Sequence, residues 1–286
     1  MKRKRLKKPI RILLVVLVIT VIAAIAAVLL RKPVKEVPVE EPEETVEEVI
    51  AEPEEEIEEV IEEIAPEPYE LSEEELAELR QELREDQEIN PDVTSILHFK
   101  SGLIHDPVLQ YYDENYYLYK DWQTKEYLSY GSIVLDSRNQ LNLDDMNTII
   151  YGHYIYEFRN PDRTLVFTPL SQLLEEDAYE ENKYLALLRK DEIRYYEIAS
   201  VYNCPLDTIG EYQYARYGLE YNLLEYDEEY FDLYHQNIKQ NEYYSTDVEF
   251  GPDDHYLTLQ TCIENHNEAR EIVLCKEIAR IPLEEE

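Results

Sequence analysis

The chain has 286 residues and a formal net charge of −37 at pH 7, because 64 Asp and Glu residues outnumber 27 Lys and Arg. That length is enough for one globular domain of ordinary size plus appendages. So acidic a chain repels nucleic acid and anionic lipid headgroups, so we interpret the charge as a source of solubility that specifies no partner.

The first 32 residues have the pattern of a membrane anchor. Residues 1–11 carry seven Lys or Arg, and residues 12–30 form an unbroken apolar stretch. Nineteen residues at ~1.5 Å each span a hydrocarbon core of ~30 Å as a helix. We favour an uncleaved anchor over a signal peptide, whose apolar region has only ~7–15 residues and precedes a small-residue cleavage site. The basic tail predicts a cytoplasmic N-terminus and an extracellular remainder.

An acidic stalk and one helix follow the anchor. Residues 31–70 are rich in Glu and Pro, a composition that opposes collapse and predicts an extended stalk. Residues 71–90 are predicted to form a helix that packs on the following domain. Ser72 and Glu75 have the spacing of a capping box, leucines recur at helical spacing, and Asn90-Pro91 ends the segment.

The remaining residues, 91–286, form the predicted catalytic domain. Short β-rich runs separated by turns dominate it, which favours a β-barrel or sandwich with added helices over a doubly wound sheet. The expected strands are Ser95–Phe99, Gly131–Leu135, Thr148–Tyr151, Glu192–Tyr202, His255–Gln260 and Glu271–Ile281, and the expected helices are Asn115–Lys120, Leu170–Asp177 and Tyr226–Asn241.

Three segments place reactive side chains at the ends of expected strands. His153 ends the run NTIIYGH, Cys262 ends HYLTLQTC, and Arg270 begins the next strand. A thiolate nucleophile is favoured by nearby positive charge, and an imidazole can pass a proton to a leaving amine. An Arg supplies fixed positive charge where an oxyanion develops. The three residues are therefore the candidate catalytic group.

Each of these residues has a simpler interpretation. Cys262 could be a buried structural thiol, His153 a turn histidine bonded to backbone, and Arg270 a partner for the abundant Glu. His266 is a rival base, although its polar loop favours solvent exposure. Cys204 and Cys275 are expected to be buried or inert, and they could pair only if they lie close together.

The segments GSIVLDSRN (131–139), NTIIYGH (147–153) and TLQTC (258–262), followed by Arg270, resemble the sortases, in particular class B. The resemblance extends from about residue 90 to residue 281. It implies an eight-stranded sortase-type β-barrel. It also implies a Gram-positive membrane enzyme that attacks a C-terminal sorting signal through Cys262, in class B typically a motif like NPQTN, and passes the acyl group to an amine.

The resemblance also assigns roles. His153 would be the general acid/base, Arg270 would stabilise the tetrahedral intermediate, and Glu264 would help to orient the site. The acceptor would be an amine of cell-wall peptide or a pilin lysine, so the enzyme would anchor proteins to the wall or assemble pili. No cofactor is implied. We expect Tyr117, Leu118, Gln260 and Thr261 to contact the sorting peptide, with a plain helical core face as the alternative for Tyr117 and Leu118.

Two other functions compete with the transpeptidase. A tethered extracellular binding module with an inactive site is suggested by the acidic stalk and the 26 Tyr, a residue favoured in recognition patches. A papain-like peptidase fits less well, because its Cys usually precedes its His. The remaining histidines, His98, His105, His235 and His255, lack the spacing of metal ligands, so we expect no metal.

Overall fold

The computed structural model describes residues 69–156, 159–209, 212–215, 223–263 and 266–284. The predicted basic tail, the transmembrane helix and nearly all of the stalk lie outside these residues. None of the helices within the described ranges has the length and apolar character needed to cross a membrane.

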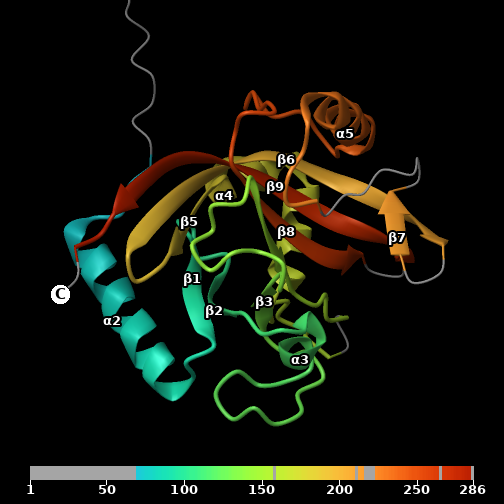
Figure 1. Cartoon of the computed structure of the whole chain (residues 1–286). Helices are drawn as coiled ribbons and strands as arrows, with labels where there is room; N and C mark the ends of the chain where they lie inside the picture. The colour runs from blue at the N-terminus through green and yellow to red at the C-terminus, as the bar shows by residue number, and fades with distance from the viewer. Residues whose placement is uncertain (1–68, 157–158, 210–211, 216–222, 264–265, 285–286) are drawn as a thin grey trace, which may run out of the picture. The chain divides into compact units, whose positions relative to one another are not determined.

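Eight strands close into a ring (Figure 1). Around the ring they run β1-β2-β3-β4-β8-β9-β6-β5, and pairing of β5 with β1 completes it. A further strand, β7, pairs with the far end of β6. Most neighbours are antiparallel, but β2–β3 and β4–β8 are parallel. The strands are β1 (Val93–Phe99), β2 (His105–Leu109), β3 (Ile133–Leu135), β4 (Asn147–Tyr151), β5 (Tyr184–Leu188), β6 (Glu192–Ile209), β7 (Tyr212–Ala215), β8 (Tyr256–Ile263) and β9 (His266–Pro282). This confirms the eight-stranded barrel expected from the sequence.

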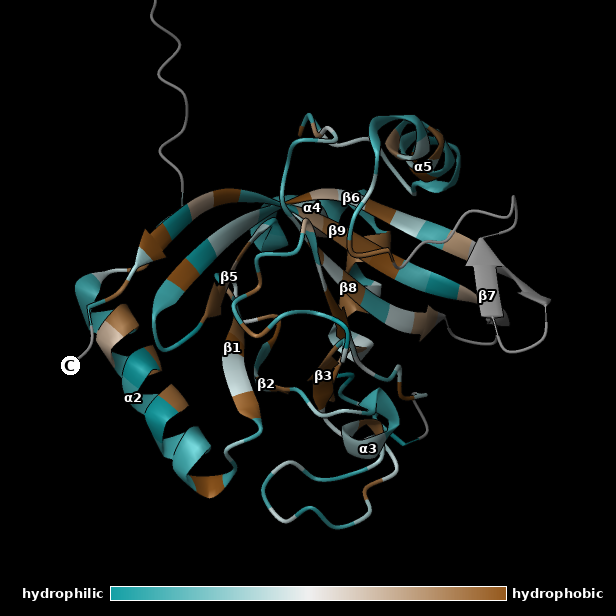
Figure 2. Ribbon diagram, viewed as in Figure 1, coloured by the Kyte–Doolittle hydropathy of each residue, from teal (hydrophilic) through white to brown (hydrophobic). Residues whose placement is uncertain are grey.

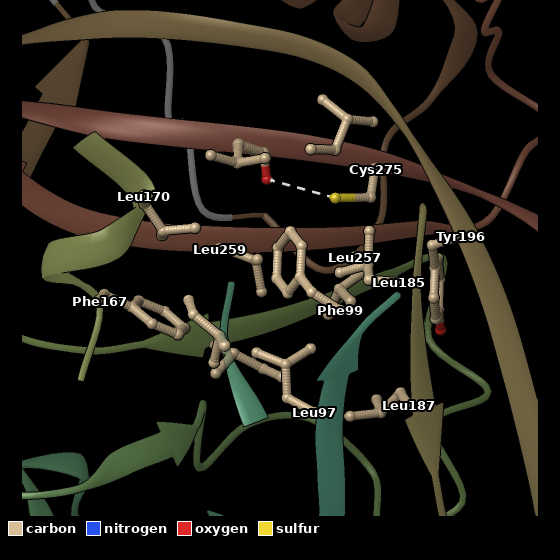
Figure 3. Packing of buried hydrophobic residues seen from close by; sticks show 14 of the residues in the cluster. Leu97, Phe99, Phe167, Leu170, Leu185, Leu187, Tyr196, Leu257, Leu259 and Cys275 are labelled. Carbon is tan, nitrogen blue, oxygen red and sulfur yellow. Dashed lines mark hydrogen bonds between the residues drawn. The ribbon is translucent and has the colours of Figure 1, made fainter. Parts of the chain in front are cut away.

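The barrel closes around an apolar interior. Leu97, Leu187, Leu257, Leu259 and Val273 are at most 1% exposed and belong to one cluster (Figure 3). Alternate residues of a strand point to opposite faces, so each strand gives the interior every second side chain, and the ribbon changes hydropathy along its strands (Figure 2). At about 25 cal/mol per Å² of buried apolar surface, this core dominates the stability of the fold.

Helices cover parts of the outside. The first, α2, has the capping box expected at Ser72 and Glu75 and ends at Asn90 as predicted. Helix α5 packs beside β6, over an aromatic second cluster (Figure 1). The helices are α2 (Glu73–Ile89), α3 (Glu114–Leu118), α4 (Tyr179–Asn182) and α5 (Glu228–Asn241), with 3-10 turns η1 (Thr168–Leu174) and η2 (Glu176–Ala178).

The sequence pattern missed three strands. The short strands β2, β5 and β7 were not expected, and the predicted helix at Leu170–Asp177 is two 3-10 turns. β2 holds Pro107 and begins with polar residues, and β5 is a continuous apolar run without alternation. Neither has the period of two that identifies a half-buried strand.

Candidate active site

The parallel pairing of β4 with β8 brings His153 and Cys262 to the same end of the barrel. Their register pairs Tyr151 with Gln260, and the Gly152 N–H donates to the Gln260 carbonyl at 3.2 Å. His153 and Cys262 each lie two residues beyond that pair. Residues in register on neighbouring strands project to the same face, so the end of β4 delivers His153 to the edge of the sheet at which Cys262 stands on β8.

Arg270 completes the row from the other side. The antiparallel register of β8 with β9 places Arg270 opposite Cys262, and that of β6 with β9 places it opposite Cys204. The row Cys204–Arg270–Cys262 therefore crosses three adjacent strands on one face of the sheet. One guanidinium N–H group of Arg270, at Nη1, donates to the Ala269 carbonyl at 2.9 Å. The structure thus places Cys262 and Arg270 opposite each other, with His153 following the neighbouring strand β4 at the same end of the barrel.

Burial separates Cys262 from the other cysteines. All three are free thiols, so Cys204 and Cys275 form no disulfide with each other. Cys204 and Cys275 are fully buried, whereas Cys262 is partly exposed. Burial raises the pKa of Cys204 to about 12, although the charge of Arg270 opposes the shift, and burial raises the pKa of Cys275 as well. Of the three thiols, only Cys262 combines access to solvent with an adjacent guanidinium, the conditions for a reactive thiolate.

Backbone contacts hold the His153 ring. Burial lowers the pKa of His153 and favours the neutral imidazole, while a hydrogen bond to the Leu118 backbone acts in the opposite direction. The Tyr119 ring lies 5.0 Å from the imidazole, centroid to centroid. The Nε2 atom is buried and has no hydrogen-bond partner, so this nitrogen remains available for proton transfer.

Two glycines make these contacts possible. A Cβ on Gly152 would lie 2.6 Å from the Phe167 ring. The Phe167 backbone N–H donates to the His153 carbonyl at 3.2 Å. A Cβ on Gly131, which has φ +55°, would lie 2.1 Å from the Leu118 carbonyl oxygen. Gly131 thus permits the close approach of the same backbone segment that holds His153.

Two of the residues expected to contact the peptide are buried. Tyr117 is 1% exposed, and its hydroxyl is bonded to Asp92 at 2.6 Å and to Asn90 at 2.9 Å, so it belongs to the core. Thr261 is 2% exposed and projects to the face opposite Cys262. Gln260 projects to the Cys262 face, is 9% exposed and has a buried, unpartnered Oε1, while Leu118 is half-buried. Glu264 and the side chain of His266 lie outside the described residues.

Sequence reasoning missed the residues that position the imidazole. Gly131 stands in the GSIVLDSRN segment that carried the resemblance. Its close approach to Leu118 brings the end of α3 against the start of β3, and no local sequence pattern predicts a contact between these two segments. Phe167 lies in a loop with no strand or helix period. The available signal was Gly131 at the start of GSIVLDSRN and Gly152 directly before His153.

Comparison with known proteins agrees with this geometry. No family model matches the chain. Sortase B of Listeria monocytogenes is 32% identical over 188 residues, which cover 65% of this chain and 68% of that protein. Sortase B of Staphylococcus aureus is 26% identical over 204 residues, which cover 71% and 77%.

Solved structures show the same barrel. Clostridium perfringens sortase B superposes with a TM-score of 0.57 at 29% identity, covering 68% of this chain and 99% of that one. A substrate complex of the S. aureus enzyme and a sortase B complex with triglycine, 24% and 22% identical, show the shared fold. The chain belongs to the sortase B family of cysteine transpeptidases.

Proposed function

We propose that this chain is a membrane-anchored transpeptidase that cleaves a C-terminal sorting signal and joins the protein to an amine outside the cell. The single observation that carries the proposal is the row that His153, Cys262 and Arg270 form at the end of β4, β8 and β9. The apolar segment 12–30 supports the anchor, because it would hold the domain where exported substrates pass.

The first half of the reaction forms a thioester. The Cys262 thiolate attacks the carbonyl carbon of the scissile peptide bond, and the carbonyl oxygen becomes an oxyanion. Arg270 supplies positive charge to that oxyanion. His153, having taken the thiol proton, returns it to the departing amine as the C–N bond breaks. The acyl group then remains on Cys262.

The second half reverses these roles. An acceptor amine attacks the thioester carbon, His153 takes its proton, and the Cys262 thiolate leaves. The known complexes of relatives with a substrate and with triglycine support a peptide donor and an amine acceptor. We propose a wall-peptide amine or a pilin lysine as acceptor, with Gln260 and Leu118 near the bound peptide and Glu264 in an orienting role.

Trapping the acyl-enzyme tests the proposal. The full chain is incubated with a panel of sorting-signal peptides, NPQTN among them, and intact-mass spectrometry detects a hydroxylamine-sensitive adduct. Adding triglycine or a lysine peptide should discharge the adduct and identify the acceptor. We expect Cys262→Ala to lose the adduct and Cys204→Ala, the matched control, to keep it. An adduct of equal yield in Cys262→Ala would contradict the proposal, and its absence in every protein would favour the inactive binding module.

A further inference from the structure

A second polar row lies directly behind the catalytic one. The registers of β6, β9 and β8 place Asn203 opposite Glu271 and Glu271 opposite Thr261. Each of these residues neighbours a member of the Cys204–Arg270–Cys262 row in the chain, so its side chain projects to the other face. Two residues further along, β6, β9 and β8 give that face the core residues Val201, Val273 and Leu259. The polar row therefore caps the apolar interior of the barrel.

The row presents three oxygen atoms without a partner. Asn203 Oδ1, Glu271 Oε1 and Thr261 Oγ1 are each buried and make no hydrogen bond. Glu271 is 1% exposed and Thr261 2% exposed, so neither side chain is hydrated from bulk solvent. Buried polar atoms in folded proteins almost always have partners, and three orphans in one row point to a missing group.

The unmet atoms select what that group can be. An amide oxygen and a carboxylate oxygen only accept hydrogen bonds, whereas a hydroxyl donates one hydrogen bond and also offers lone pairs. Directly opposite residues of neighbouring strands have Cβ atoms about 5 Å apart, so the three side chains can converge on one small guest. A carboxylate buried without a counter-charge is costly. A cation removes that cost and can contact all three oxygens at once.

We infer that Asn203, Glu271 and Thr261 form a binding site for a hard, oxygen-preferring metal cation of the Na⁺ or Ca²⁺ type, with water completing its coordination. Carboxylate, amide and hydroxyl oxygens are ligands that such cations prefer. No group of three His, Cys, Asp or Glu suited to a metal occurs in the described part of the chain. Two of the three protein ligands must therefore be neutral, and because they come from three strands, their spacing gave no metal signature in the sequence.

The position gives the cation a structural task. Its ligands are the chain neighbours of Cys204, Arg270 and Cys262, so an occupied site ties β6, β9 and β8 together at the end where the thiol and the guanidinium emerge. The Tyr243 N–H donates to the Val201 carbonyl at 3.0 Å, which places Tyr243 and its neighbour Tyr244 beside β6, two residues from Asn203. These rings can transfer excitation to a bound Tb³⁺, an oxygen-binding substitute for Ca²⁺.

Thermal unfolding of the full chain tests the site. The midpoint is measured in CaCl₂ and in NaCl, each against tetramethylammonium chloride of equal ionic strength. A ligand that binds only the folded protein raises the midpoint, here by roughly 2–4 °C at saturating concentration. The variants are Glu271→Gln, Thr261→Val and, as a matched control, Asp253→Asn, which removes one exposed acid from a turn.

We expect the cation to raise the midpoint of the wild type and Asp253→Asn and to leave that of Glu271→Gln unchanged, with Thr261→Val in between. Whichever of Na⁺ and Ca²⁺ produces the rise is the ligand. Tb³⁺ emission excited through tyrosine gives a second measurement and should lose one saturable component in Glu271→Gln. Should Glu271→Gln not fold, Thr261→Val alone decides by the same comparison. An equal rise in all four proteins, or no rise and no saturable Tb³⁺ component, would overturn the site and leave buried water as the guest.

Discussion

The strands β6 and β9 are built differently at their two ends. Near the start of β6, the Arg194 side chain is 1% exposed, yet its guanidinium is surrounded by acceptors. It donates to the Asn142 carbonyl at 2.8 Å and to Leu143, and it pairs with Glu192 at 2.5 Å and Glu277 at 3.5 Å. The Arg194 guanidinium is therefore satisfied by a polar network inside the barrel wall.

The other end of the same strands leaves its polar groups unsatisfied. Asn203, Glu271 and Thr261 have buried oxygens without partners, and the His153 Nε2 is in the same condition. Unmet polar groups lower stability, so proteins keep them mainly where a ligand, a proton or a substrate uses them. The contrast teaches that this barrel derives polar stability from the Arg194 end and leaves unmet polar groups at the end for which we propose the chemistry.

The largest stability effect should follow from cutting the satisfied network. Arg194→Ala leaves Glu192 and Glu277 without their shared buried partner, and loss of one member of a buried pair costs about 3–5 kcal/mol. We expect the urea midpoint to fall accordingly, while the acyl-enzyme yield per folded molecule stays unchanged at low temperature. A stability loss below about 1 kcal/mol, the range of an exposed pair, would show that the network contributes little.

Arg270→Ala should have the opposite profile. The guanidinium is partly exposed and faces Cys262 across the β8–β9 ladder, so its loss removes charge from the oxyanion. Removing one such group typically lowers kcat by about 10²–10³. We expect that loss in kcat/KM for a sorting peptide, with the urea midpoint nearly constant. Arg270→Lys, the control that keeps the charge, should recover part of the rate, and a fully active Arg270→Ala would remove Arg270 from the mechanism.

Gly131→Ala tests whether the Leu118 segment positions His153. The new Cβ would meet the Leu118 carbonyl oxygen at 2.1 Å, so that segment must shift. We expect kcat to fall roughly 10–100-fold, a partial loss of the roughly 10²–10⁴-fold that general acid–base catalysis contributes, and the pH profile of kcat/KM to move. Gly102→Ala is the matched control, because Gly102 also has positive φ, +81°, but no atom within 4 Å. It carries the backbone strain of about 1–2 kcal/mol without the clash, so equal loss of activity in both variants would refute a specific role.

A feature could be predicted from the sequence when the residues that form it lie close together in the chain. Cys262, His153 and Arg270 could be proposed as the catalytic group because each ends or begins an apolar run of strand character, a local pattern. The capping box at Ser72 was equally local and is confirmed. Gly131, Phe167 and Glu271 act through neighbours that are remote in the chain, so no window of sequence shows their role. For Tyr117 the sequence left both a peptide groove and the core open, because an aromatic stripe at helical spacing is compatible with either; the structure places it in the core.

The smallest expected effect concerns Asp106 and tests how a carboxyl group without a partner changes the stability of the fold. In contrast to Glu277, which is paired with Arg194 and Arg280, the Asp106 carboxyl makes no hydrogen bond or ion pair within the described residues, although its backbone pairs with β1. Burial raises its pKa from 3.8 to about 6, so the folded protein holds a proton there that the unfolded chain releases. The contribution of the protonated Asp106 to the free energy of unfolding is fully present below pH 3.8 and is lost as the pH rises through 6. We expect Asp106→Asn to match the wild type at about pH 3.5 and to be more stable by roughly 1–2 kcal/mol at about pH 7.5, measured by urea unfolding. An equal difference at both pH values would mean that Asp106 is paired or solvated in solution.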